Sequence, residues 1–192
     1  GGLILVNAVG QAPTRSRLRN VVASSIKYVI VKYWVDIVTD QLEALQKLLT
    51  DAIFDEAALA PALQTLADYC DAPIAQFAIT DQRSTLLESA FAGVEHDDIA
   101  AMEAEYWCIN PRAQALTALA PDRVVTDRDV ITPEQIRTNP AYQELLIPKG
   151  FGHFAGSIVE KTSERMAAFG IFRPFRIDPF GAAEITRFQA AT

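Results

Sequence analysis

The alternation of hydrophobic and polar positions is clearest between Phe151 and Phe175, where two apolar runs flank a polar turn at residues 162–164. The second run has an apolar residue at every position from 166 to 172. Because successive strand residues point to opposite faces, both faces of this strand are apolar. The pattern predicts a hairpin whose second strand is central in a sheet, covered by helices on one face and by a loop or a ligand on the other.

A short helix is expected just before this hairpin. Asn139 and Pro140 suit an N-cap and a first helical residue, because proline needs no helical N–H partner there. Pro148, Lys149 and Gly150 end the helix and release the chain into extended structure.

A second hairpin is predicted earlier in the chain. Residues 74–80 and 85–91 are apolar runs that flank the polar segment 81–84, and a helix over 56–70 precedes them. Further helices are expected between the hairpins, begun by Asp97 or Asp98, by Asn110-Pro111 and by a capping box at Thr132. A short strand over 124–126 and a terminal helix introduced by Asp178-Pro179 complete the pattern.

This order of elements predicts an α+β fold, a GAF/PAS-like antiparallel sheet with helices packed on its faces. A parallel doubly wound sheet would need regular β-α-β alternation, which the sequence lacks. We expect two parts: residues 1–40 as an N-terminal extension and residues 41–192 as the main domain. A helix from about Arg19 to Phe54 would provide a dimer seam, or would pack only on its own sheet.

The composition changes this picture only modestly. The chain has 192 residues, of which half are hydrophobic, and a net charge of −7, which argues against direct binding of nucleic-acid phosphates. Residues 1–40 carry a net charge of +3, and the remainder carries −10. The two cysteines form no CxxC motif, so we expect free thiols, a reducing cytoplasm and no metal or cofactor. We expect neither a membrane-spanning segment nor a signal peptide.

Residues 103–156 carry a family resemblance. Asn110-Pro111 follows an aromatic helix, Val125-Thr126-Asp127 comes next, and Tyr142-Gln143-Glu144-Leu145 precedes Pro148 and Gly150. This order resembles the amino-terminal sensor region of bacterial LuxR-type helix-turn-helix transcriptional regulators. The resemblance extends from about Leu42 to the end of the chain. It implies a cytoplasmic, ligand-sensing, homodimeric domain that contacts DNA only through a helix-turn-helix lying outside this chain.

The quorum-sensing members of that superfamily bind acyl-homoserine lactones. Their pattern has an aspartate before the proline, a tyrosine nine residues earlier and a tryptophan thirteen residues earlier. Here those positions hold Asn110, Ala101 and Asp97. The three departures argue against binding of an acyl lactone.

The candidate ligand-binding residues are aromatic side chains and two polar ones on the predicted inner faces: Tyr106, Trp107, Asn110, Tyr142, Phe151, His153 and Phe172. Aromatic rings with polar edges suit ligand cavities, although core packing is their commoner role and Asn110 is most simply an N-cap. We expect a cavity for a small organic ligand beside Phe151, His153 and Phe172.

Two other functions stay open. A ligand-free dimerisation or interaction module would have a filled core and a large apolar surface, made by residues 26–54. A small hydrolase would need Cys70 or Cys108 beside His153 as nucleophile and base. No nucleophile elbow or phosphate loop supports an enzyme, so we expect none.

Overall fold

The computed structural model describes residues 39–52, 55–121 and 123–192. The chain divides into two compact units, residues 1–41 and 42–192. The predicted helix from Arg19 and dimer seam from Ile26 lie outside the described residues up to residue 38. Residues 39–52 are helical, as predicted for that part of the segment.

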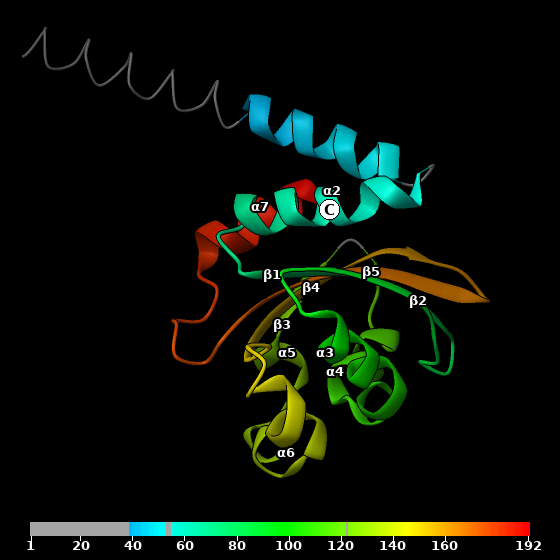
Figure 1. Ribbon diagram of the computed structural model, residues 1–192, viewed down its shortest axis with the longest axis vertical. Coiled ribbons are helices and arrows are strands. Elements are labelled where there is room, and N and C mark those ends of the chain that lie inside the picture. Colours follow the sequence, from blue (N-terminus) through cyan, green and yellow to red (C-terminus); the bar gives the residue numbers. More distant parts are fainter. Residues whose placement is uncertain (1–38, 53–54, 122) are drawn as a thin grey trace, which may run out of the picture. The chain divides into compact units, whose positions relative to one another are not determined.

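The larger unit is built on one five-stranded antiparallel sheet (Figure 1). Its strands are β1 (Ile74–Asp81), β2 (Leu86–Ala92), β3 (Val124–Thr126), β4 (His153–Lys161) and β5 (Arg165–Arg173). The order across the sheet is β2-β1-β5-β4-β3. Both predicted hairpins are confirmed, and β5 is the central strand, because it pairs with β1 on one side and β4 on the other.

One face of the sheet is covered by α2 (Glu56–Tyr69) and α7 (Ala182–Ala191) (Figure 1). Leu45, on the helix that ends at residue 52, packs with them, and the Gln46 side chain donates to the Ala190 carbonyl at 3.0 Å. The buried residues here form the terminal-helix cluster: Leu45, Leu63, Leu66, Ala67, Cys70, Ala72, Ala75, Ala92, Ala155, Ile171, Phe188 and Ala191.

The opposite face is covered by a succession of short helices (Figure 1). They are α3 (His96–Ala101), π-helical η1 (Met102–Tyr106), 3₁₀ turn η2 (Trp107–Ile109), α4 (Pro111–Thr117), α5 (Asp127–Val130), α6 (Pro133–Thr138) and π-helical η3 (Ala141–Leu146). Short helices therefore cover the face on which the sequence predicted a loop or a ligand, and the loop was wrong. Each helix has only a turn or two, too few residues for a helical hydrophobic period to stand out in the sequence.

Several helix starts follow the predicted chemistry. The Asn110 side chain accepts a hydrogen bond from the Arg112 N–H at 3.0 Å, and Thr132 and Gln135 form the capping box. The Asn139 side chain accepts from the Ala141 N–H at 2.8 Å. These caps confirm three of the predicted helix starts, because short polar side chains satisfy the first N–H groups of a helix.

One predicted helix start was wrong, and another lies three residues further along the chain. Glu95 occupies the N-cap of α3, so Asp97 and Asp98 lie within its first turn. The positive end of the helix dipole stabilises their carboxylates there. The terminal helix begins at Ala182 behind Gly181, after the chain has passed Asp178-Pro179. Gly181 has no side chain to cap the helix, but its N–H donates to the Glu184 side chain at 3.1 Å.

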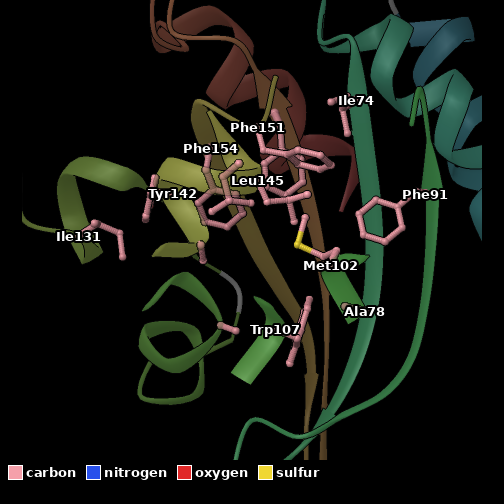
Figure 2. Close-up of a cluster of buried hydrophobic side chains, with 14 of the residues drawn as sticks. Ile74, Ala78, Phe91, Met102, Trp107, Ile131, Tyr142, Leu145, Phe151 and Phe154 are labelled. Atoms are coloured by element: carbon pink, nitrogen blue, oxygen red, sulfur yellow. The ribbon is translucent and has the colours of Figure 1, made fainter. Parts of the chain in front are cut away.

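The face covered by short helices has a core that we call the aromatic cluster (Figure 2). Its buried members are Ile74, Ala78, Phe91, Met102, Trp107, Ala113, Val125, Ile131, Ala141, Tyr142, Leu145, Leu146, Phe151, Phe154 and Phe172. Phe154 and Phe172 lie over Gly156 and Gly170, where an added Cβ would meet their rings. Glycines at these paired positions let two phenylalanine rings lie against the sheet.

Candidate functional site

A buried ion pair lies beside the aromatic cluster. Arg112 Nε donates to Asp127 Oδ1 at 2.8 Å, and Nη2 donates to Oδ2 at 2.9 Å. The arginine side chain is only 2 % exposed. The guanidinium also donates to the carbonyl oxygens of Phe151 at 2.8 Å and Gly152 at 2.5 Å. One side chain thus joins α4, α5 and the chain entering β4.

The surroundings of this pair are aromatic. The guanidinium carbon lies 4.8 Å from the ring centre of Tyr142, 5.3 Å from that of Phe154 and 5.7 Å from that of Phe172. These distances are within the range of cation–π attraction. The Tyr142 hydroxyl donates to Asp127 at 3.2 Å, and burial is the main reason that the pKa of Tyr142 is raised.

The local sequence explains why Arg112 points inward. Asn110 caps α4 and Pro111 occupies its first turn, which places residues 111–113 on the buried side of the helix. Nothing in the sequence pairs Arg112 with Asp127, because the two are fifteen residues apart and come from separate short helices. The pair was therefore missed at the sequence level.

Beside this pair is a groove of about 430 Å³, which we call the α5–β4 groove. Its apolar wall is formed by seven residues: Ile131, Pro133, Ile136, Phe154, Phe175, Pro179 and Phe180. Its polar lining comes from Thr126, Asp127, Arg128 and His153. Small-molecule sites have this size and this balance of apolar walls with a few polar groups.

His153 is the only predicted site residue in the lining of this groove. Its ring meets that of Phe175 edge-on, with 4.6 Å between centres. Burial lowers its pKa below the ordinary value of 6.5, and the Arg112 and Arg173 charges act in the same direction. The Asp127 carboxylate and a hydrogen bond to the backbone of Ile177 oppose that shift. The ring is therefore mainly neutral at pH 7.

One wall of the groove is the segment between β5 and α7, and Arg173 holds it in place. The Arg173 guanidinium donates to the carbonyl of Asp178 at 3.2 Å and to that of Asp71 at 2.8 Å. It also lies 4.1 Å from the ring centre of Phe180. The buried Arg173 side chain thus holds this wall of the groove in position.

The other predicted residues lie elsewhere on the same side of the sheet. Trp107, Tyr142, Phe151 and Phe172 are buried in the aromatic cluster (Figure 2). Trp107 donates its indole N–H to the Ser84 carbonyl at 2.9 Å. The adjacent Tyr106 is half-buried, and its hydroxyl donates to Glu144 at 3.0 Å. The structure therefore brings most of the candidates together as packed core, and places the groove next to His153 and Phe154.

A second, larger groove of about 880 Å³ lies on the face covered by α2 and α7. Its apolar lining includes Leu49, Leu59, Phe77, Ile79 and Phe169, and we call it the β1–β5 groove. The rings of Phe77 and Phe169 are 5.0 Å apart on neighbouring strands. Glu88, Glu160 and Arg165 supply charged groups to its lining.

The thiol–histidine pair that a hydrolase would need is not assembled in the described residues. Cys70 is buried in the terminal-helix cluster, where burial raises its pKa to about 12, and Cys108 is exposed. Neither lines the groove that His153 lines. Among the residues that the structure describes, no cluster of His, Cys, Asp or Glu could hold a metal, and no helix is long and apolar enough to cross a bilayer.

The chain matches no known protein-family model and no curated protein sequence. It is similar in structure to the N-acylhomoserine lactone dependent LuxR family transcription factor CepR2 from Burkholderia cenocepacia, with a TM-score of 0.59 and 15 % identity. That match covers 81 % of this chain and 88 % of CepR2. It is also similar to the VqsR LBD domain from Pseudomonas aeruginosa, with a TM-score of 0.53 and 17 % identity over 83 % of this chain and 96 % of that one. These similarities support the predicted α+β fold.

Proposed function

We propose that residues 42–192 form the ligand-sensing domain of a LuxR-type transcriptional regulator, with the DNA-binding helix-turn-helix outside this chain. The observation that carries the proposal is the α5–β4 groove, whose apolar wall and few polar groups match a small-molecule site. The fold shared with CepR2 supplies the regulatory context. The order β2-β1-β5-β4-β3, built from two hairpins, supports our extension of the proposal to the GAF/PAS-like type.

The ligand that we propose is not an acyl-homoserine lactone, although CepR2 depends on one. Asn110 uses its side-chain oxygen to cap α4. Asp97 is exposed in the first turn of α3, and Ala101 has no polar side chain to offer. Arg112, two residues beyond Asn110, adds a guanidinium to the interior beside Phe154 and Phe172. These groups do not suit a lactone headgroup.

The groove is well placed to report occupancy to the rest of the domain. Its lining comes from α5, α6, β4 and the segment before α7, so a ligand would contact all four at once. Asp127 belongs both to the lining and to the ion pair that holds α4. A ligand that binds one arrangement of these elements more tightly shifts the population toward it. In a homodimer, that shift would reposition the attached DNA-binding modules.

Thermal-shift screening of a metabolite library tests the sensing function. The wild-type chain and Phe175→Ala are compared, because Phe175 is 36 % exposed and its truncation removes groove wall without opening the core. We expect compounds that raise the melting temperature of the wild type and have less effect on the variant. A library that stabilises neither protein, with native mass spectrometry showing no adduct, would contradict the proposal.

The β1–β5 groove favours the second candidate function, a ligand-free interaction module. Phe77 and Phe169 in its lining offer an apolar surface of the kind that protein partners cover. Sedimentation velocity of residues 1–192 and of residues 41–192 separates the two functions. An assembly that forms without ligand and is lost on Phe169→Ser favours the module, whereas a ligand-dependent change in assembly favours the sensor.

A further inference from the structure

The polar groups of the α5–β4 groove restrict the chemistry of a ligand. Asp127 is the acidic residue of the lining, yet its carboxylate is already fully engaged. Oδ1 accepts from Arg112 and Tyr142, and Oδ2 accepts from Arg112 and the Phe154 N–H. A carboxylate offers about four acceptor positions, and here four donors occupy them. Its charge is also offset by the adjoining guanidinium.

The Thr126 hydroxyl already donates to Asp129 at 2.9 Å, and Arg128 is exposed. His153 is therefore the half-buried side chain of the lining whose hydrogen-bonding capacity is left for a ligand. A neutral imidazole has one N–H donor and one acceptor nitrogen. The backbone of Ile177 acts on the ring only in the direction that raises its pKa. Among the hydrogen bonds of the described residues, none occupies the acceptor nitrogen of this ring, which lines the groove. A ligand would have to bring an O–H or N–H group to meet it.

The charges around His153 disfavour an ionic ligand. Asp127 lies on one side, and the Arg112 and Arg173 charges act on the ring from α4 and β5. A buried anion would face the Asp127 carboxylate, and a buried cation would face two guanidinium groups. Arg128 is the other charged residue of the lining and is exposed, so its pairing with an anion would be weak. The free-energy cost of removing water from a charged ligand would therefore not be compensated by the groups that line the groove.

The wall favours flat apolar groups. Phe154, Phe175 and Phe180 contribute three rings, and Ile131 and Ile136 contribute branched aliphatic side chains. Aromatic rings pack well edge-on or offset against other rings. An aromatic body can therefore lie along the wall while its polar group reaches His153.

We propose that the α5–β4 groove binds an uncharged aromatic molecule that carries an O–H or N–H donor, with His153 as the acceptor. The proposal rests on the proposed sensing function only in taking this groove as the ligand site. It defines a chemical class (phenols, indoles and related neutral donors) and assigns His153 a role in selecting for it.

Four naphthalene probes of nearly equal size test this class on the full chain at neutral pH: 2-naphthol, 2-methoxynaphthalene, 2-naphthoate and 2-naphthylmethylammonium. Isothermal titration calorimetry measures the affinity of each. We expect 2-naphthol to bind about tenfold more tightly than 2-methoxynaphthalene, which has no donor, because one net hydrogen bond is worth about that factor. The two ions should bind more weakly than 2-naphthol.

His153→Leu removes the acceptor and keeps an apolar side chain. We expect the preference for 2-naphthol over 2-methoxynaphthalene to fall to about onefold in this variant, while 2-methoxynaphthalene still binds. His96→Leu is the matched control, because His96 is exposed and does not line the groove, and it should keep the wild-type preference. Circular dichroism is recorded for both variants to check that they fold.

The outcomes separate the ligand class from the proposed function. If an ionic probe binds most tightly and Phe175→Ala weakens it, the groove is a ligand site and the ligand class is wrong. If His153→Leu keeps the preference for 2-naphthol, the role of His153 is wrong. If no probe binds, the ligand class is overturned, and the sensing function then stands or falls with the library screen.

Discussion

Arg112 and Asp127 are joined by two parallel hydrogen bonds of 2.8 and 2.9 Å in the interior, and the carboxylate also lines a groove that is open to solvent. The pair connects two short helices, α4 and α5. Burial of an ion pair costs desolvation energy that its attraction only partly returns, so the pair is weak support for stability alone. Its position behind the groove gives it a second role, because it fixes part of the groove lining.

Breaking this pair should destabilise the domain strongly. Arg112→Met leaves the Asp127 carboxylate buried without its main partner, and we expect a loss of about 3–5 kcal/mol in the free energy of unfolding. Urea denaturation followed by circular dichroism measures it. The double variant Arg112→Met/Asp127→Asn should lose less than the sum of the two single variants, because it removes both charges together.

The matched control is Arg137→Met. Arg137 pairs with Glu134 at 2.7 Å, but both side chains are more than half exposed. Exposed pairs contribute at most about 1 kcal/mol. Equal losses for Arg112→Met and Arg137→Met would show that the buried pair has no special place in the fold.

Asn110 should act as a helix cap and not as a ligand contact. Asn110→Ala removes the acceptor of the Arg112 N–H bond, and we expect a loss of about 1 kcal/mol in stability. Asn110→Ser, which keeps a good capping oxygen, should recover most of it. The affinity for 2-naphthol, measured by calorimetry, should be unchanged in the serine variant. A large loss of affinity with normal stability would assign Asn110 to the binding site after all.

Much of the fold could be predicted from the sequence because its signals are local. The apolar runs at residues 74–80 and 165–175, the turns between strands and the caps at Asn110 and Thr132 each depend on a few adjacent residues. Arg112 could not be predicted in this way. Its side chain is buried by partners at Asp127, Phe151 and Gly152, and no local pattern distinguishes it from an exposed arginine in a first helical turn.

The candidate site was predicted only in part, for a related reason. An apolar strand residue such as Phe151 or Phe172 can face a cavity or a packed core, and its sequence neighbours are the same in both cases. The structure packs these two rings 5.1 Å apart in the core. His153 lines a groove because residues 174–180 return beside the start of β4, and that return is a tertiary contact.

Gly156 should not tolerate a side chain. An added Cβ would meet the far edge of the Phe154 ring, and that ring packs against Phe172 and the Arg112 guanidinium. We expect Gly156→Ala to cost about 1–3 kcal/mol, as overpacking of a core does. Thermal unfolding measures the change. Gly181→Ala is the control, since its Cβ would meet only the flexible end of Glu184 at 3.0 Å.

The stability of the domain should depend on His153 at mildly acidic pH. The pKa of His153 is lowered in the folded state, chiefly by burial, so the unfolded chain binds the proton more readily. Stability therefore falls as the pH drops below about 6.5, the ordinary histidine value, and the fall continues until the folded-state pKa is passed. Unfolding free energies between pH 7.5 and pH 5 measure this slope.

His153→Gln should flatten that slope, because glutamine does not titrate, whereas His96→Gln should leave it in place. A slope that is identical in the wild type and in His153→Gln would mean that His153 is as easily protonated in the folded chain as in the unfolded one. Its place beside Arg112 and Arg173 would then not affect its charge.

The most direct test of the central claim is to map a bound ligand on the chain. Backbone amide NMR spectra recorded during a 2-naphthol titration report which residues the molecule touches. We predict saturable shifts confined mainly to residues 126–136, 153–154 and 175–180, which line the α5–β4 groove. Shifts confined to residues 46–52, 77–79, 159–169 and 190–192, which include most of the lining of the β1–β5 groove, would contradict the account.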